Sequence, residues 1–375
     1  MNAFLFPGQG SQHVGMGDGL FDAFPDLTAA ADAILGYSIK DLCLKDPDKT
    51  LGQTQFTQPA LFVVNALACR RRLEDGGRPP DFTAGHSLGE YNALECAGVF
   101  SFEDGLRLVQ RRSALMAKAK GGGMAAILGI GPDKVAGVLS ENGFDAIDVA
   151  NYNGDSQTVI SGLRQDVDRA QSAFEAAGAM FIPLNVSGAF HSRYMQPAGT
   201  EYARFLADFT FAAPRLPVMS NVTALPYQAG TIRQGLSEQL THCVRWAESM
   251  HYLLDQGVTE FTEVGPRDVL TKLIRGIRNR YQPSARPKAS PPAAPAPVPV
   301  DAPAPLPVEV EPSKPAAQRV ADWNAAHPVG TRVRVKGYAE PLATKTEALV
   351  LFGHRAAVYM QGYNGYFALD EVRPA

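Results

Sequence analysis

Along residues 1–280, short apolar runs alternate with longer stretches in which apolar residues recur every three or four positions. The short runs predict strands, and the longer stretches predict amphipathic helices. A Ser-x-x-Asp pair beginning at Ser101 is typical of a helix start and predicts a helix through about Ala119. The other elements predicted before it are Ala3–Phe6, Gln58–Leu73, Phe82–Gly85 and Leu88–Ala97. This alternation indicates an α/β fold.

Residues 121–192 are predicted to contain the order strand, helix, strand twice in succession. The predicted order is a strand Met124–Gly129, a helix Asp133–Ser140, strands Ala146–Asn151 and Thr158–Gly162, a helix Val167–Ala177 and a strand Met180–Asn185. This βαββαβ order is that of a ferredoxin-like subdomain. It predicts a small subdomain inserted into a larger α/β body made of residues 1–120 and 193–282.

The periodic pattern is lost between Pro283 and Pro315, where 12 of the 28 prolines lie among alanines. Such a segment buries too little apolar surface to fold, and proline stiffens it towards polyproline II. We therefore interpret residues 283–318 as a Pro/Ala-rich linker. A ligand for an SH3-type domain is the alternative.

Short runs of alternating polarity return in residues 319–375. Val333 and Val335 alternate with basic residues, which predicts a half-buried strand over Thr331–Lys336. Several such strands predict a small β-barrel-like domain. Its aromatic residues form either the core or a protein-binding face, and we hypothesise that the domain docks a synthase or carrier partner. These aromatic residues are Tyr338, Tyr359, Tyr363, Tyr366 and Phe367.

Composition narrows the class of protein. The 375 residues are 45% hydrophobic and 19% charged, which excludes wholesale disorder. A net charge of −3 predicts neither a nucleic-acid partner nor attraction to an anionic membrane. The start MNAFLFPGQG lacks the features of a secretory signal. The four separated cysteines favour reduced thiols in a cytoplasmic protein rather than a disulfide framework or a metal site. They are Cys43, Cys69, Cys96 and Cys243.

The motif GHSLG at 85–89 fits the GxSxG pattern of a nucleophilic serine. Chance alone supplies roughly 0.15 such matches in a chain of this composition. A predicted strand precedes Ser87 and a predicted helix follows it, as a nucleophile elbow requires. The alternative is a serine that only caps a helix.

A nucleophilic serine needs a general base, and His191 is the best candidate among the seven histidines. It lies in the loop that leaves the last predicted strand of the inserted subdomain, and functional residues concentrate in such loops. His86 is adjacent to Ser87, so the two side chains point in different directions at a tight turn. A purely structural role is the alternative for His191, and the one favoured for His242 and His251.

Four motifs occur together and in order: GQGSQ at 8–12, GHSLGEYNALECAG at 85–98, GAFHS at 188–192 and EVGP at 263–266. Together they resemble the malonyl-CoA:acyl-carrier-protein transacylase family, including the stand-alone acyltransferases that serve polyketide synthases. The resemblance covers roughly residues 1–280. It implies an α/β-hydrolase-like body carrying the inserted ferredoxin-like subdomain.

Placed on this sequence, the resemblance implies that Ser87 is the nucleophile and His191 the general base of a Ser–His dyad. It implies that the main-chain N–H groups of Gln9 and Leu88 form the oxyanion hole. Gln239 would orient His191 through an oxygen acceptor, in place of the carboxylate of a hydrolase triad.

Arg112 can be assessed from helical spacing. It lies four residues after Leu108 and three before Leu115, on the apolar stripe of its predicted helix, whereas Arg111 lies on the polar face. A guanidinium on a buried face needs an anionic partner. That partner is either a protein carboxylate or, as the resemblance implies, the malonyl carboxylate held by a bidentate fork.

The resemblance implies a ping-pong transfer of malonyl from malonyl-CoA to the phosphopantetheine thiol of an acyl carrier protein, without a cofactor, in polyketide or fatty acid biosynthesis. The bulky Phe190 before His191 implies a preference for malonyl over methylmalonyl. Arg267 departs from the family pattern, which usually has glycine there. Two alternatives stay open: an acyl hydrolase of the same fold that clears acyl groups from carrier proteins, and a docking module whose dyad is vestigial.

Overall fold

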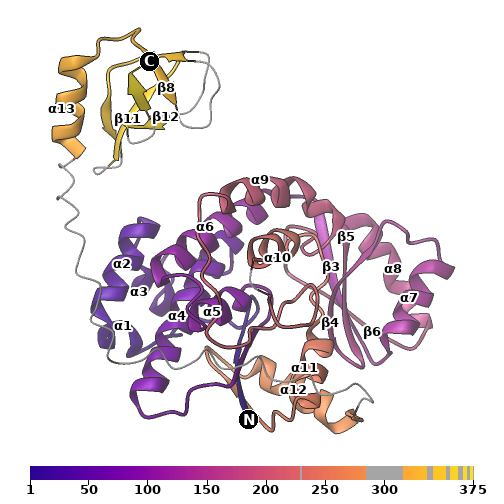
Figure 1. Cartoon of the computed structure of the whole chain (residues 1–375). Helices are drawn as coiled ribbons and strands as arrows, with labels where there is room; N and C mark the ends of the chain where they lie inside the picture. The colour runs from indigo at the N-terminus through magenta and orange to yellow at the C-terminus, as the bar shows by residue number, and fades with distance from the viewer. Residues whose placement is uncertain are drawn as a thin grey trace. The chain divides into compact units, whose positions relative to one another are not determined.

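The computed structural model describes residues 1–228, 230–283, 316–335, 341–351, 355–361, 366–369 and 372–374. The chain divides into two compact units, Met1–Pro297 and Val298–Ala375. Figure 1 shows the elements of each unit, and each unit is described by itself. Within the described residues, no helix is both long and apolar enough to cross a membrane.

A short parallel sheet lies at the centre of the first unit. Its strand order is β2 (Phe82–Gly85), β1 (Asn2–Phe6) and β7 (Glu260–Glu263). Alternate residues of β1 face opposite sides, so that Phe4 packs in one apolar core and Leu5 in the other. Both faces of the sheet are therefore covered, as parallel sheets require.

Helices from distant parts of the chain cover the two faces of this sheet. On the Phe4 side the core draws on α1 (Leu20–Ala23), α2 (Pro25–Leu35), α3 (Ile39–Leu44), α4 (Thr54–Glu74), α5 (Gly89–Cys96), α6 (Phe102–Lys118), α9 (Gln196–Leu206) and α10 (Ile232–Glu238). On the Leu5 side it draws on α11 (Trp246–Asp255) and α12 (Val269–Arg280). The predicted cap of α6 is confirmed, because the Ser101 hydroxyl accepts the N–H of Asp104 at 3.1 Å.

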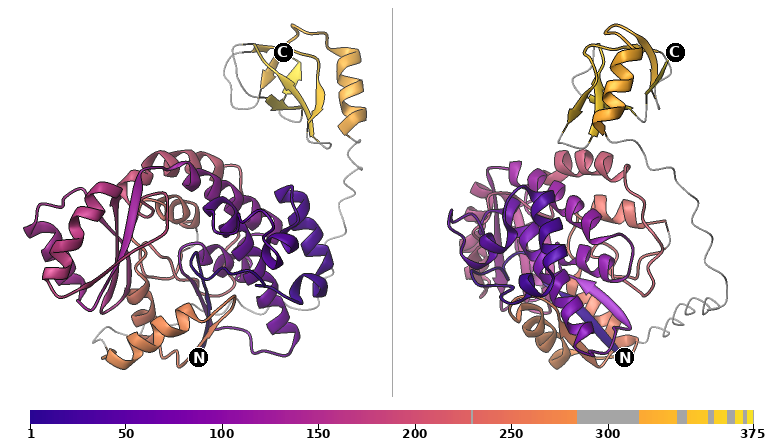
Figure 2. Two further views of the ribbon diagram at one scale, coloured as in Figure 1. Left: turned by 180° about the vertical axis from the view of Figure 1, so that it is seen from behind. Right: turned by 90° about the vertical axis from the view of Figure 1, so that its left-hand side faces the viewer.

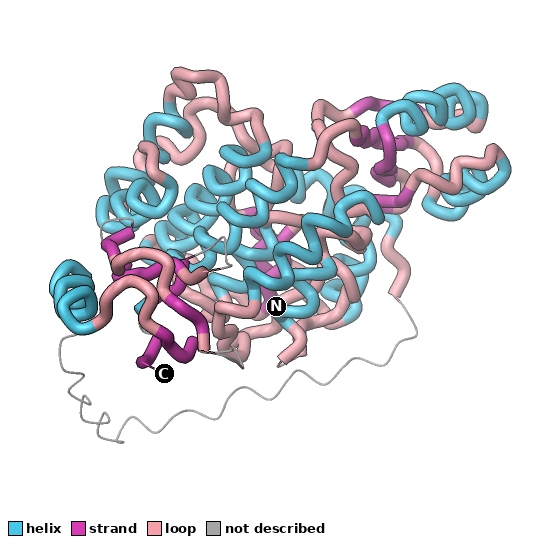
Figure 3. Tube along the Cα trace, turned by 90° about the horizontal axis from the view of Figure 1, so that it is seen from above, coloured by secondary structure: helices cyan, strands magenta, loops and turns pink. Residues whose placement is uncertain are grey.

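Residues 122–183 form a second, antiparallel sheet. Its strand order is β4 (Asp148–Gly154), β5 (Gln157–Leu163), β3 (Gly122–Leu128) and β6 (Met180–Pro183). Helices α7 (Pro132–Glu141) and α8 (Arg164–Ala176) cover one face, as the view from behind in Figure 2 shows. Figure 3 shows the same sheet set to one side of the helical body. The order of strands and helices is the one predicted, with ends that differ by a few residues.

The second unit contains a helix that the sequence analysis did not predict. Helix α13 (Ala316–Ala326) is the first described element of this unit, so the predicted linker end at residue 318 is wrong by at least three residues. The reason is local: Pro315 is the last proline of the proline-rich segment, and the alanines directly after it favour a helix. Residues 284–315, which make up most of the predicted linker, lie outside the described residues.

Strands make up the rest of the second unit. One sheet has the order β13 (Val372–Pro374), β8 (Arg332–Val335) and β9 (Leu342–Ala343), and the other the order β10 (Leu349–Leu351), β11 (Arg355–Tyr359) and β12 (Tyr366–Ala368). Val333 and Val335 are buried and Arg332 and Arg334 are exposed, which confirms the predicted alternation. The side chains of the five aromatic residues proposed as core or binding face lie outside the described residues.

Candidate active site

The nucleophile elbow connects β2 to α5. Ser87 lies between them with φ of +53°, a left-handed conformation that non-glycine residues rarely adopt. A Cβ atom on Gly85 would lie 1.9 Å from the carbonyl carbon of Gly89, and one on Gly89 would lie 1.9 Å from the carbonyl oxygen of Phe6. Glycine is therefore needed at both positions for the strand, the turn and the helix to pack this closely.

Ser87 and His191 meet across the site. Ser87 Oγ lies 2.7 Å from His191 Nε2, although the two residues are 104 positions apart. His191 Nδ1 lies 2.8 Å from the main-chain carbonyl oxygen of Gln239, which follows α10. Because a carbonyl only accepts, Nδ1 carries the hydrogen and Nε2 offers its lone pair to the serine hydroxyl. The predicted oxygen acceptor on Gln239 is thus its main-chain carbonyl.

The environment of His191 keeps its imidazole uncharged. The side chain is 4% exposed, and burial together with the nearby positive charge of Arg112 lowers the pKa of His191 to about 3. Burial disfavours the charged imidazolium, and a neighbouring cation adds to that effect. At neutral pH the residue is therefore ready to accept a proton from Ser87.

Arg112 is completely buried and lies next to Ser87. Its guanidinium donates to Gln58 Oε1 at 2.6 Å, to Gln239 Oε1 at 2.7 Å and to Ser87 Oγ at 3.1 Å. Within the described residues, no carboxylate forms an ion pair with it, so the predicted alternative of an internal salt bridge is not what this site contains. A cation held by neutral oxygens next to the nucleophile is suited to receive an anionic group.

The glycine-rich turn after β1 lies directly against the elbow. A Cβ on Gly8 would lie 2.4 Å from the carbonyl oxygen of His86 and 3.6 Å from the main-chain nitrogen of Leu88. In the described part of the chain, neither the N–H of Gln9 nor that of Leu88 donates to another main-chain group. Both therefore remain available near Ser87.

Phe190 packs into the apolar core and is 4% exposed. Its ring folds back over Gly188, where a Cβ atom would lie 2.6 Å from a ring carbon. Glycine at 188 thus allows the ring to lie in this position.

A family profile described as an acyl transferase domain matches residues 3–290. The chain belongs to this acyl transferase domain family. Its α/β body is similar to the malonyl CoA-acyl carrier protein transacylase of Burkholderia pseudomallei, with a TM-score of 0.74 at 51% identity over 75% of this chain and 99% of the other.

Two further relatives are informative about this acyl transferase domain. It is 52% identical over 286 residues to the polyketide biosynthesis malonyl CoA-acyl carrier protein transacylase BaeC of Bacillus velezensis, covering 76% of this chain and 99% of BaeC. It is also similar to a malonyl-transacylase solved in complex with its type II PKS acyl-carrier protein, AntF. That structure has a TM-score of 0.71 at 39% identity, covering 74% of this chain and 93% of the other.

The sequence analysis missed Asn221, which supports the elbow of the acyl transferase domain. Asn221 Oδ1 accepts the main-chain N–H of Ser87, and its Nδ2 donates to the carbonyl of Gly85, both at 2.7 Å. Val218 forms a parallel bridge to Thr83 of β2, and the segment then runs on to bring Asn221 beside the turn. No motif marks this residue, because its role depends on a chain segment more than 130 residues away from Ser87.

The other histidines weighed as alternatives lie in structural positions. His86 Nε2 contacts Asn153 Oδ1 at 2.7 Å, and its ring packs against Trp246 with centroids 5.5 Å apart. His242 Nδ1 contacts the carbonyl of Glu238 at 2.8 Å. The histidine that meets Ser87 is His191, as predicted.

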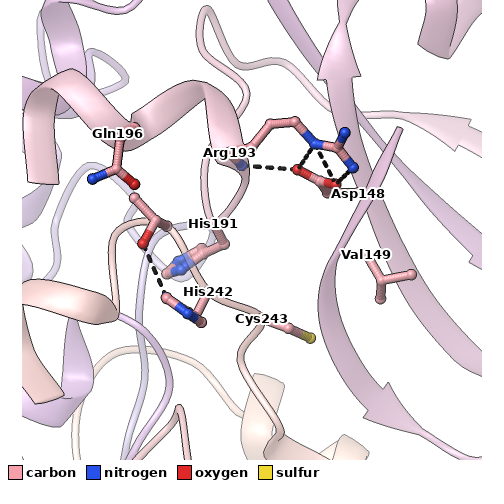
Figure 4. A pocket seen from close by; sticks show the side chains of 8 residues that line it. Asp148, Val149, His191, Arg193, Gln196, His242 and Cys243 are labelled. Carbon is pink, nitrogen blue, oxygen red and sulfur yellow. Dashed lines mark hydrogen bonds and ion pairs between the residues drawn. The ribbon is translucent and has the colours of Figure 1, made fainter. Parts of the chain in front are cut away.

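A cavity of about 380 Å³ opens beside the dyad (Figure 4). His191 forms part of its wall, and an ion pair between Arg193 and Asp148 lies across from it, with Nε to Oδ1 at 2.9 Å. The residues lining the cavity are Asp148, Val149, His191, Arg193, Gln196, Thr241, His242 and Cys243. The cavity thus connects His191 to solvent. It lies between β4 of the second sheet and the segment that follows α10.

Proposed function

We propose that this chain transfers a malonyl group from malonyl-CoA to the phosphopantetheine thiol of an acyl carrier protein, through an ester on Ser87. One observation carries the proposal: Ser87 Oγ lies within hydrogen-bond distance of both the neutral His191 and the buried Arg112. A base and a fixed cation at one hydroxyl suit an acyl donor that carries its own carboxylate. The relatives with this name and the family membership support the same activity.

In the first half-reaction, His191 Nε2 takes the proton of Ser87 while Oγ attacks the thioester carbonyl of malonyl-CoA. The N–H groups of Gln9 and Leu88 bind the oxygen on which negative charge develops. The tetrahedral intermediate collapses, the C–S bond breaks, and the thiolate of coenzyme A leaves with the proton from His191. The product is malonyl-Ser87.

In the second half-reaction, the phosphopantetheine thiol of the carrier protein takes the place of coenzyme A. His191 removes the thiol proton, sulfur attacks the ester carbonyl, and Ser87 recovers its proton as it leaves. Arg112 holds the malonyl carboxylate through both steps and so fixes the orientation of the acyl group. Phe190 restricts space near the α-carbon and favours malonyl over methylmalonyl by a modest factor of roughly 10- to 200-fold.

The fold supplies this chemistry in a defined way. Residues 1–120 and 193–282 form an α/β-hydrolase-like body that carries Ser87, Arg112 and Gln239. Residues 121–192 form a ferredoxin-like subdomain that delivers His191 from the opposite side of the cleft. The Pro/Ala-rich linker and the small β-rich domain after it extend the reach of the enzyme towards a synthase or carrier partner.

Intact-mass spectrometry tests the proposal. Wild-type protein mixed with malonyl-CoA gains one malonyl group, and holo acyl carrier protein then removes it and becomes malonylated itself. The alternative activity, an acyl hydrolase, releases malonate at the same rate with and without the carrier protein. A protein that binds the carrier but never gains the malonyl adduct is a docking module, and the proposed transfer is then wrong.

A further inference from the structure

Glu90 is a buried carboxylate for which the proposed mechanism has no role. It lies three residues after Ser87, at the first turn of α5, and its exposed fraction is 0%. Its Oε1 accepts the main-chain N–H of Asn221 at 2.8 Å and the hydroxyl of Tyr227 at 2.9 Å. Its Oε2 accepts a hydrogen bond from Gln239 Nε2. A carboxylate with three donors in a dry site is held in one position.

Gln239 connects Glu90 to the reacting groups. Its Nε2 also donates to the main-chain carbonyl of Ser87 at 2.8 Å, and its Oε1 accepts two hydrogen bonds from Arg112, at 2.7 and 3.2 Å. Its main-chain carbonyl accepts the Nδ1–H of His191. The side-chain amide therefore has its NH2 group on the Glu90 side and its oxygen on the Arg112 side.

The charge of Glu90 determines which way this amide points. An ionised carboxylate only accepts hydrogen bonds, so the NH2 group of Gln239 must face it and Oε1 must face the guanidinium. If the amide reversed, its NH2 group would meet the N–H groups of Arg112, donor against donor, and Ser87 would lose a contact. The same anion also offsets the buried positive charge of Arg112.

We propose that ionised Glu90 is the positioning residue that, through Gln239, holds Arg112 in the orientation needed to grip the malonyl carboxylate. This rests on the proposed function, because it assigns Arg112 to the acyl carboxylate. It predicts that Glu90 controls the preference for malonyl over acetyl rather than the chemistry common to both donors.

The carboxyl group of Glu90 titrates within the pH range of the proposed assay. Burial raises the pKa of Glu90 to about 7, against the lowering effect of its hydrogen bonds and of Arg112. The charged and titratable groups that face it are Arg112 from α6 and Tyr227 from the segment before α10. Since burial keeps the pKa of His191 near 3, that imidazole does not titrate between pH 6 and 8. Loss of malonyl preference on acidification in this range therefore reports on Glu90.

The test compares Glu90→Gln with Glu95→Gln. Glutamine at 90 keeps the shape and the Oε1 acceptor for Asn221 and Tyr227, but it places an NH2 group against the NH2 group of Gln239. Glu95 is the matched control, because it is also a buried carboxylate of α5 but pairs with Arg70. The measurement is kcat/KM for acylation of Ser87 by malonyl-CoA and by acetyl-CoA, from pH 6 to 8, with a melting curve for each protein.

For Glu90→Gln we expect the malonyl rate to fall by about 10- to 100-fold, while the acetyl rate changes by less than about threefold. The Glu95→Gln variant keeps the wild-type ratio. The wild-type ratio rises with pH through about 7, as Glu90 ionises, and the ratio for Glu90→Gln stays low and flat. An unchanged ratio, or equal losses with both donors, overturns the inference.

Tyr227→Phe keeps the inference testable if Glu90→Gln does not fold. This variant removes one hydrogen bond that stabilises the ionised carboxylate, so the pKa of Glu90 rises and the pH at which malonyl preference appears moves upward. If Tyr227→Phe shows the same pH profile of the malonyl-to-acetyl ratio as the wild type, the proposed role of Glu90 is refuted. Failure of the proposed function is seen separately, because the wild-type protein would then not be malonylated at all.

Discussion

Replacing Arg112 by alanine tests the proposed role of this residue in selecting the acyl group. The substitution removes a guanidinium that lies 3.1 Å from Ser87 Oγ. Each charge-assisted hydrogen bond to a carboxylate contributes about 1.5–3 kcal/mol. Two such bonds, less the desolvation of the substrate carboxylate, leave about 2–4 kcal/mol, which is roughly a 30- to 1000-fold loss in kcat/KM for malonyl-CoA. Acetyl-CoA has no carboxylate, so its transfer changes far less.

The change also affects folding, and the assay must separate the two effects. Alanine at 112 leaves the amide oxygens of Gln58 and Gln239 without this donor, at about 1–3 kcal/mol each. Partial unfolding lowers transfer of both acyl groups equally, so the malonyl-to-acetyl ratio isolates the site. Arg111→Ala is the matched control, since Arg111 is the adjacent residue of α6 and pairs with Glu201 of α9 instead of facing Ser87. Equal losses with both donors would refute the role of Arg112 in gripping the carboxylate.

Three further predictions concern other parts of the chain. Ser87→Ala abolishes the malonyl adduct seen by intact mass, while the melting temperature stays within a few degrees because alanine at this left-handed position carries the same Cβ as serine; an adduct on the variant would contradict this. Arg267→Gly stabilises the fold by about 1 kcal/mol in urea unfolding, because Arg267 is exposed with φ of +66°, where glycine is favoured; no gain would contradict this. Deletion of residues 283–375 leaves malonylation of Ser87 intact and raises KM for the cognate carrier protein; unchanged carrier kinetics would remove the docking role.

The elements around Ser87 and those of the inserted subdomain could be predicted from the sequence because their apolar residues recur with a clear period. The helices α1–α3 and α9–α12 of the body were not among the predicted elements. The strand Phe82–Gly85 was predicted to the residue, and the helix after Ser101 ends within a residue of its predicted end. Strand β7 was missed because Glu260–Glu263 is short, polar at both ends and lies at the sheet edge. Helix α13 was missed because the adjacent prolines dominate the composition of that segment.

The candidate site was predictable where a residue type and a local pattern carry the chemistry. GxSxG marked Ser87, and helical spacing placed Arg112 on a buried face. The partners of Arg112 were not predictable, since Gln58 and Gln239 reach it from α4 and from the end of α10. Asn221 was missed for the same reason: amide side chains take their roles from tertiary neighbours.

Two buried groups of this site shift in opposite directions, which gives a prediction about stability. The folded-state pKa of Glu90 is raised from 4.5 to about 7, so the folded protein binds more protons than the unfolded chain between these values. The folded-state pKa of His191 is lowered from 6.5 to about 3, so there the unfolded chain binds more. As pH rises from 4.5 to 6.5, Glu90 therefore lowers stability while His191 raises it.

The contribution of each group is isolated by subtracting the free energy of unfolding of its variant from that of the wild type, because the titrations of all other groups cancel. Between pH 4.5 and 7, the free energy of unfolding of the wild type relative to Glu90→Gln should fall by about 3 kcal/mol, at about 1.4 kcal/mol per pH unit for one proton. Relative to His191→Ala it should rise by a similar amount up to pH 6.5. Urea titrations at four pH values measure both differences. Parallel curves for wild type and variants would mean that neither group is as dry as its burial implies, and that the site admits water when it is empty.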